Sequence, residues 1–134
     1  MALFLKKEAN GVKFEVAFSD KINVLKGASG TGKSFLFSVI SSYCASENIP
    51  YALVDYRFVS EDNTEAILQY CKGKEIIILD NADLYLTPEL FMGIQKLGAT
   101  MIISKKTTFG LDMREAHLYA VDYIKGSLKT RRIC

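Results

Sequence analysis

Apolar and polar residues alternate regularly near the start of the chain. In Val12–Phe18 every second side chain is apolar, a period of two that predicts a strand with one buried face. Ala2–Lys7 is a second candidate strand, and Asn10-Gly11 between the two is a strong hairpin signal. The chain is therefore expected to begin with an antiparallel hairpin.

The middle of the chain alternates between short apolar runs and helical periodicity. Apolar residues recur at helical spacing after Lys33, and the continuous run Ile76–Leu79 suits a strand that is covered on both faces. We expect strands over residues 22–26, 51–55, 75–80 and 100–104, and helices over residues 33–46, 63–71 and 87–96. Strands that alternate with helices in this way predict βαβ units and a parallel sheet.

The end of the chain returns to strand patterns. Leu118–Ile124 and Leu128–Ile133 are expected to form a second hairpin, preceded by a short helical turn within residues 111–116. With 134 residues and no evident linker or repeat, residues 1–134 are expected to form a single domain. The expected fold class is α/β: a parallel sheet flanked by helices, with an antiparallel hairpin at each end.

Composition adds limits on the compartment and the partners. The net charge of +2 is too small to indicate nucleic acid by itself. The cysteines Cys44, Cys71 and Cys134 are odd in number and widely spaced, which favours a reducing compartment over a disulfide framework or a zinc site. No apolar run approaches the ~20 residues of a membrane span. We therefore expect a cytoplasmic protein with no membrane span.

The strongest chemical signal lies between the third strand and the first helix. Its residues are, in order, Gly27, Ala28, Ser29, Gly30, Thr31, Gly32, Lys33 and Ser34. They satisfy the phosphate-loop pattern G-x-x-x-x-G-K-[ST] at every fixed position. Glycines let the backbone wrap around phosphate oxygens, and the helix after them directs its unpaired N–H groups to the same place. We expect these residues and Phe35 to bind the cofactor.

A second chemical signal is the acidic residue that ends the run Ile76–Leu79. Asp80 comes directly after this run. In open α/β sheets, ligands bind outside the carboxyl ends of the strands. Asp80 is therefore expected to meet the phosphate loop.

These two segments resemble the Walker A and Walker B motifs of the P-loop NTPase superfamily. The resemblance implies a nucleotide with Mg²⁺, with Lys33 on the β- and γ-phosphates and Ser34 and Asp80 on the metal. The N-terminal hairpin and Ser104 at a strand end look more like the ATPase branch that includes ABC, AAA+ and RecA-like proteins. That branch implies the parallel strand order 5-1-4-3-2 and a polar sensor role for Ser104. The guanine-reading motif N-K-x-D is absent from the sequence, so ATP is expected rather than GTP.

The sequence departs from that branch directly after Asp80. Many of these ATPases have a glutamate there to orient the attacking water, whereas this chain has Asn81. Asp83 could take over as a catalytic carboxylate, or it could be a helix-start carboxylate favoured by the dipole. The sequence shows no obvious arginine finger, a group that can raise hydrolysis by about 10³ to 10⁵ when supplied in trans. Slow turnover by the isolated chain is therefore expected.

Three functions are compatible with these motifs. The leading one is an Mg-ATP-binding ATPase that acts as a switch or motor domain with a protein partner or in a homo-oligomer. The others are a small-molecule kinase and a nucleotide-binding module without hydrolysis. The basic segment Lys125–Arg132 could bind nucleic acid, or it could be the solvated face of the hairpin. Phe4 and Phe14 are candidates for stacking on adenine, by loose analogy with ABC proteins.

Overall fold

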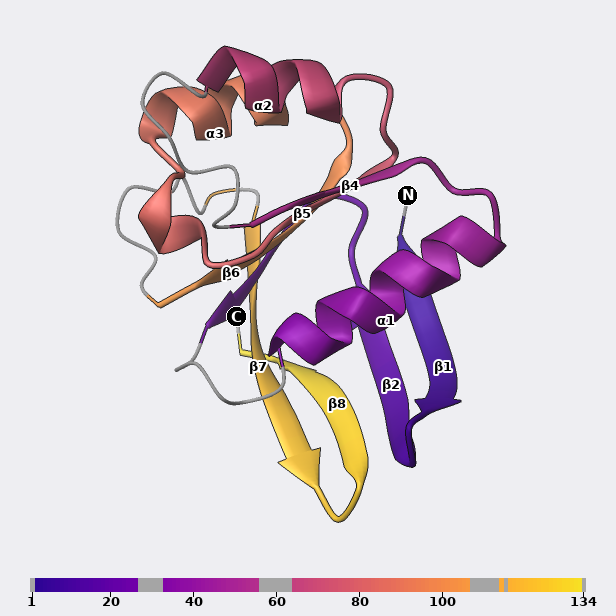
Figure 1. Cartoon of the computed structure of the whole chain (residues 1–134). Helices are drawn as coiled ribbons and strands as arrows, with labels where there is room; N and C mark the ends of the chain where they lie inside the picture. Colours follow the sequence, from indigo (N-terminus) through magenta and orange to yellow (C-terminus); the bar gives the residue numbers. More distant parts are fainter. Residues whose placement is uncertain (1, 27–32, 56–63, 107–113, 115, 134) are drawn as a thin grey trace.

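The strands form one sheet, and helices lie against both of its faces (Figure 1). A computed structural model of the protein describes residues 2–26, 33–55, 64–106, 114 and 116–133. The strands are β1 (Leu3–Ala9), β2 (Val12–Phe18), β3 (Ile22–Lys26), β4 (Tyr51–Val54), β5 (Ile76–Leu79), β6 (Thr100–Lys105), β7 (Ala116–Ile124) and β8 (Ser127–Arg132). The helices are α1 (Lys33–Ser46), α2 (Thr64–Cys71) and α3 (Pro88–Gln95), together with the 3₁₀ turn η2 (Ala82–Leu84).

These elements confirm most of the expected segments to within a residue or two. The turn η2 was not expected, and most of the helical turn expected within residues 111–116 lies outside the described residues. The N-terminal hairpin is confirmed, since β1 and β2 pair antiparallel. Asn10 and Gly11 join them with φ values of 52° and 77°. This left-handed pair is what a tight hairpin turn requires, and Asn and Gly adopt it most readily.

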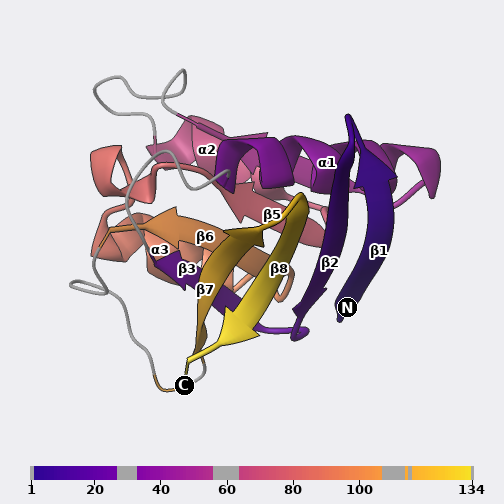
Figure 2. The same ribbon diagram turned by 90° about the horizontal axis from the view of Figure 1, so that it is seen from below.

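The expected sheet, by contrast, was wrong. We expected a parallel sheet flanked by helices, in the order 5-1-4-3-2, with an antiparallel hairpin at each end. The described residues instead form a single mixed sheet of eight strands in the order β1-β2-β8-β7-β3-β6-β5-β4. Neighbouring strands from β7 to β4 run parallel, the pairs β1–β2 and β7–β8 run antiparallel, and β2 pairs parallel with β8. Figure 2 shows β8 between β7 and β2.

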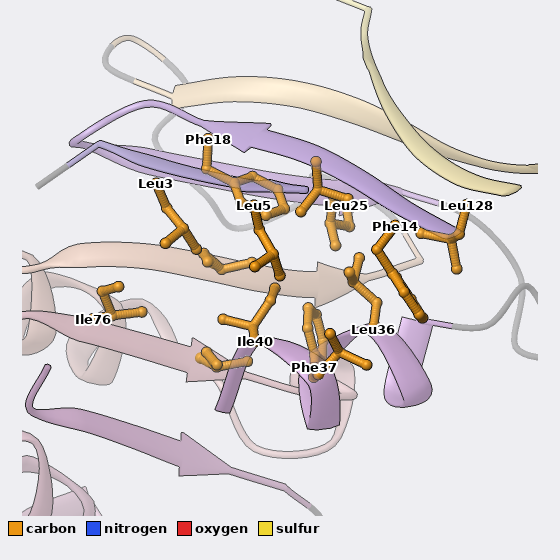
Figure 3. Close-up of a cluster of buried hydrophobic side chains, with 14 of the residues drawn as sticks. Leu3, Leu5, Phe14, Phe18, Leu25, Leu36, Phe37, Ile40, Ile76 and Leu128 are labelled. Atoms are coloured by element: carbon orange, nitrogen blue, oxygen red, sulfur yellow. The ribbon is translucent and has the colours of Figure 1, made fainter. Parts of the chain in front are cut away.

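The physical reason for this sheet is a core that the hairpins share with α1. Phe14 of β2 and Leu128 of β8 are buried in the same cluster as Leu36 and Ile40 of α1 (Figure 3). Leu25 of β3 lies in that cluster too. Burying these side chains under one helix curls the sheet around α1 and brings the edges of β2 and β8 together, where they pair. Both hairpins therefore extend the sheet instead of standing apart from it.

A second apolar cluster covers the opposite face of the sheet. Ile67 of α2 and Leu90 and Ile94 of α3 pack there against Ile77 and Ile103 of the central strands. Because β5 alternates its side chains between the two clusters, all four of its residues are buried. This is why the sequence shows a continuous apolar run there. None of the helices in the described part of the chain is long and apolar enough to cross a membrane.

Candidate functional site

The chemically active side chains gather where parallel strands end. Strand β3 ends at Lys26, and α1 begins at Lys33. Six of the expected cofactor-binding residues lie between them, outside the described residues: Gly27, Ala28, Ser29, Gly30, Thr31 and Gly32. The site is therefore built from the first turn of α1 and from the segments directly after β5 and β6.

Ser34 and Asp80 meet in this site. The Ser34 hydroxyl donates a hydrogen bond of 2.9 Å to Oδ2 of Asp80, across 46 positions of sequence. Asp80 is buried, whereas Ser34 is exposed. The contact joins the start of α1 to the carboxyl end of β5, as expected for two side chains that act on one ligand.

Lys33 is a buried cation of the site. The residue is only 8% exposed. Burial lowers the pKa of Lys33 below its usual range, whereas the neighbouring Asp80 and Asp83 carboxylates raise it and Lys106 lowers it further. A partly desolvated ammonium interacts strongly with any anion that reaches it, since the local dielectric is low.

Asp83 is tied to the end of β6. Its Oδ1 lies 3.3 Å from Nζ of Lys105, and its Oδ2 accepts a hydrogen bond of 2.8 Å from the backbone N–H of Lys106. Both carboxylate oxygens therefore already have partners. This arrangement favours a structural bridge between η2 and β6 over the alternative, a catalytic carboxylate that replaces a glutamate.

Asn81 occupies the position where the resembling ATPases have a glutamate. Its backbone is left-handed, with φ 51° and ψ 47°. Asn tolerates this conformation better than most residues, because its short polar side chain can bond locally. The residue turns the chain out of β5 into η2, which gives Asn at this position a structural reason.

Ser104 lies level with Asp80 on the neighbouring strand. Leu79 of β5 and Ile103 of β6 are register partners. Asp80 directly follows the first, and Ser104 directly follows the second. Ser104 is 2% exposed and stands opposite Leu25 of β3. Ser104 therefore lies at the end of the sheet where a sensor residue is required. This position is compatible with the sensor role, which stays a prediction.

The aromatic residues near the site have structural partners. Phe35, one of the expected cofactor-binding residues, packs edge-to-face on Phe14, with ring centroids 5.2 Å apart and an interplanar angle of 82°. Phe14 is 1% exposed, which leaves it no open face for a base. Phe4 is 64% exposed on β1. Of the two stacking candidates, only Phe4 has a ring open to solvent.

The donor set at Ser34 and Asp80 fits Mg²⁺. Mg²⁺ prefers oxygen ligands and is usually held by one or two protein oxygens together with substrate phosphates and water. A hydroxyl and a carboxylate 2.9 Å apart supply such oxygens. Within the described residues there is no group of three or more His, Cys, Asp or Glu that could hold a metal. The Ser34 hydroxyl and the Asp80 carboxylate are thus a donor pair of the kind that Mg²⁺ accepts.

A separate hollow of about 420 Å³ lies at β1, β2 and β8. Lys6, Lys13 and Lys129 line it together with Glu8 and Glu15. Lys129 pairs with Glu15 at 3.7 Å, and on the same strand Arg131 pairs with Asp122 at 2.9 Å. Acidic neighbours thus offset part of the basic C-terminal segment, which favours the solvated-face alternative over nucleic-acid binding.

Sequence reasoning missed three residues of the site: Tyr85, Lys105 and Lys106. The Tyr85 hydroxyl lies 2.6 Å from the backbone carbonyl oxygen of Asp80 and 3.0 Å from that of Val54. No local motif marks these residues, because their roles depend on how β4, β5 and β6 lie side by side. The only sequence signal was their closeness to the strand ends.

Several solved structures share this fold, whereas no family model and no curated protein matches the sequence. The genome packaging NTPase B204 from Sulfolobus turreted icosahedral virus 2, in complex with AMP, is 16% identical with a TM-score of 0.56, over 79% of this chain and 77% of that chain. A chain from the complex of the archaeal ribosomal stalk protein aP1 and the archaeal ribosome recycling factor aABCE1 is 13% identical with a TM-score of 0.59, over 96% of this chain. The alignment spans 38% of that chain. At these identities the likeness shows a shared fold alone.

Proposed function

We propose that this chain binds Mg-ATP and hydrolyses it slowly, as a switch or motor domain that works with a partner. The observation that carries the proposal is the hydrogen bond of 2.9 Å between Ser34 and Asp80. Two segments chosen from sequence for phosphate and metal chemistry come into contact, although 46 positions separate them. If Ser34 merely followed a coincidental glycine-rich sequence, nothing would favour its contact with the acidic residue at the end of β5.

Each residue has a distinct task in the proposed site. Lys33 supplies positive charge to the β- and γ-phosphates, and its burial strengthens that attraction. Ser34 and Asp80 supply oxygens to Mg²⁺, which when bound neutralises charge on the phosphates. From the phosphate-loop pattern of the sequence, we expect residues 27–32 to supply backbone N–H groups to the phosphates.

ATP is the proposed nucleotide. The absence of N-K-x-D from the sequence argues against a guanine nucleotide. The packaging NTPase that shares the fold was solved with AMP, which supports an adenine nucleotide here. We propose a protein partner or a second copy of the chain as the activator, since the sequence offers no obvious arginine finger of its own.

The two alternatives differ from this proposal in the fate of the bound nucleotide. Asn81 and the engaged oxygens of Asp83 favour a nucleotide-binding module without hydrolysis. A small-molecule kinase is less favoured because no arginine-rich lid segment is found in the sequence. Phosphorus NMR of a reaction with candidate acceptors separates them: inorganic phosphate indicates an ATPase, a phosphorylated acceptor indicates a kinase, and unchanged ATP indicates a binding module.

Isothermal titration calorimetry tests the binding step. Wild type should bind Mg-ATP saturably, and Lys33→Ala should weaken the affinity at least about tenfold, which corresponds to about 1.4 kcal/mol. Lys72→Ala is the matched control, because Lys72 is an exposed lysine just beyond α2. Binding by wild type that Lys33→Ala leaves unchanged, or no binding by wild type, would overturn the proposal.

A further inference from the structure

We propose that Tyr85 is a positioning residue that holds Asp80 in reach of Ser34. The proposal rests on the function proposed above for its consequence in metal binding, whereas the positioning itself can be tested without nucleotide. Tyr85 lies in the segment after η2 and packs, partly buried, against the apolar cluster beneath α2 and α3. Its hydroxyl is directed at the backbone of the residue whose carboxylate meets Ser34.

The contact is a small network of backbone groups at the ends of two strands. The Tyr85 hydroxyl lies 2.6 Å from the carbonyl oxygen of Asp80 and 3.0 Å from that of Val54. The backbone N–H of Asp80 donates to the same Val54 carbonyl at 2.8 Å. The hydroxyl has a single proton to donate, and the shorter of its two distances is to the Asp80 carbonyl.

The bond from Tyr85 to the Asp80 carbonyl matters because Asp80 follows the last residue of β5 that is paired with β4. The last register pair of β4 and β5 is Val54 with Leu79, one residue earlier. One residue later, Asn81 turns the chain into the left-handed conformation. The peptide group before the Asp80 Cα is therefore held by the bond to Val54 and the peptide group after it by Tyr85, and together they fix the direction in which the Asp80 side chain leaves the backbone.

Tyr85 is suited to a donor role. Its ring packs against the apolar cluster beneath α2 and α3, and its hydroxyl faces the two carbonyl oxygens at the strand ends. Replacing Tyr85 with Phe keeps the ring in the core and removes the donor alone.

Tyr70 provides a matched control. Its hydroxyl also bonds to the backbone of β4, where it accepts a hydrogen bond of 3.3 Å from the N–H of Leu53. That bond lies on an exposed edge and does not involve Asp80. Tyr70→Phe thus also removes a tyrosine hydroxyl that is bonded to the backbone of β4, but this hydroxyl bonds to Leu53 and not to Asp80.

The first test is a double-mutant cycle in thermal unfolding without nucleotide. Ser34→Ala should lower Tm by about 4 °C in wild type and by less than half as much in Tyr85→Phe, because there Asp80 is no longer held toward Ser34. In Tyr70→Phe, Ser34→Ala should cost the same as in wild type. Equal costs in all three backgrounds would show that Tyr85 is only structural and would overturn the proposal. Should Tyr85→Phe unfold, trimethylamine N-oxide, which favours the compact state, permits the same comparison.

The second test separates positioning from nucleotide binding. ATP affinity is measured by calorimetry with Mg²⁺ and with EDTA, and the ratio of the two is the enhancement by metal. Tyr85→Phe should reduce this enhancement about fivefold or more and leave the affinity in EDTA within about twofold, since a small misplacement of one metal ligand affects only the binding of the metal. An enhancement equal to that of wild type would contradict the consequence for metal binding. If wild type binds no ATP, the proposed function fails, and the cycle still decides whether Tyr85 positions Asp80.

Discussion

Replacing Ser34 with Ala should destabilise the protein even when no nucleotide is present. The substitution removes the hydroxyl that donates to Asp80 at 2.9 Å. A hydrogen bond to a charged group contributes about 1.5 to 3 kcal/mol, and the low end applies because Ser34 is exposed. Alanine recovers about 0.5 kcal/mol of helix propensity. The expected net loss in the free energy of unfolding is about 1 kcal/mol, or about 4 °C in Tm for a domain of this size.

Ser38→Ala is the control for this measurement. Ser38 lies one turn further along α1, where its hydroxyl donates to the carbonyl of Ser34 at 3.2 Å, within the helix itself. Such back-bonding gives little or no stability, so Ser38→Ala should be neutral or stabilising by about 0.5 kcal/mol. Urea unfolding monitored by circular dichroism compares both variants with wild type. Equal midpoints for Ser34→Ala and Ser38→Ala would refute the contribution of the contact between Ser34 and Asp80.

Three further predictions concern Asn81 and the buried cysteines. Asn81→Glu, which introduces the acid of the ATPases that the sequence resembles, should cost about 1 kcal/mol in urea unfolding because the backbone at this position is left-handed. Asn81→Gly should cost only a few tenths, and equal costs for the two variants would refute the argument from backbone conformation. Cys44 and Cys71 are fully buried, so alkylation with iodoacetamide and peptide mapping should find them modified only under conditions that unfold the chain, and rapid native modification would contradict this burial. Burial raises the pKa of Cys71 to about 11, above its unfolded value of 9.0, so the contribution of the buried thiol to stability is complete below pH 9 and is lost as the pH rises toward 11. The difference in unfolding free energy between wild type and Cys71→Ala should therefore shrink by about 2 kcal/mol over that range. A difference that stays constant with pH would refute this prediction.

Local patterns predicted the elements well, because each element is determined by residues close in sequence. Alternation in Val12–Phe18 and the run Ile76–Leu79 correspond directly to β2 and β5. Asn10 and Gly11 provide a turn that few other residues allow. The secondary structure of such segments can therefore be predicted from their own sequence, without knowledge of the tertiary contacts.

The single mixed sheet could not be predicted in the same way. Its decisive pairing joins Lys13 of β2 to Ser127 of β8, over most of the length of the chain. Nothing in either strand specifies the other as its neighbour. The pairing arises from a shared core under α1, in which Phe14 and Leu128 lie together. Such a core exists only once the whole chain has folded.

The candidate site shows the same division. Lys33, Ser34 and Asp80 could be chosen from sequence because phosphate and metal chemistry requires these residue types in this spacing. Tyr85 could not, because its task is to bond to backbone groups at the ends of two neighbouring strands. The bridging role of Asp83 likewise depends on where β6 ends. Residues expected to contact a ligand directly can be recognised from a sequence motif, whereas residues that position them through backbone contacts cannot.

A crystal structure with Mg²⁺ and a non-hydrolysable ATP analogue is the most direct test of the proposed site. Mg²⁺ should lie between the Ser34 hydroxyl and the Asp80 carboxylate, about 2.1 Å from Ser34 Oγ and bound to Asp80 directly or through one water. Nζ of Lys33 should contact the β- and γ-phosphates. A triphosphate found elsewhere, for example in the hollow lined by Lys6, Lys13 and Lys129, with Ser34 still bonded to Asp80, would contradict the central claim.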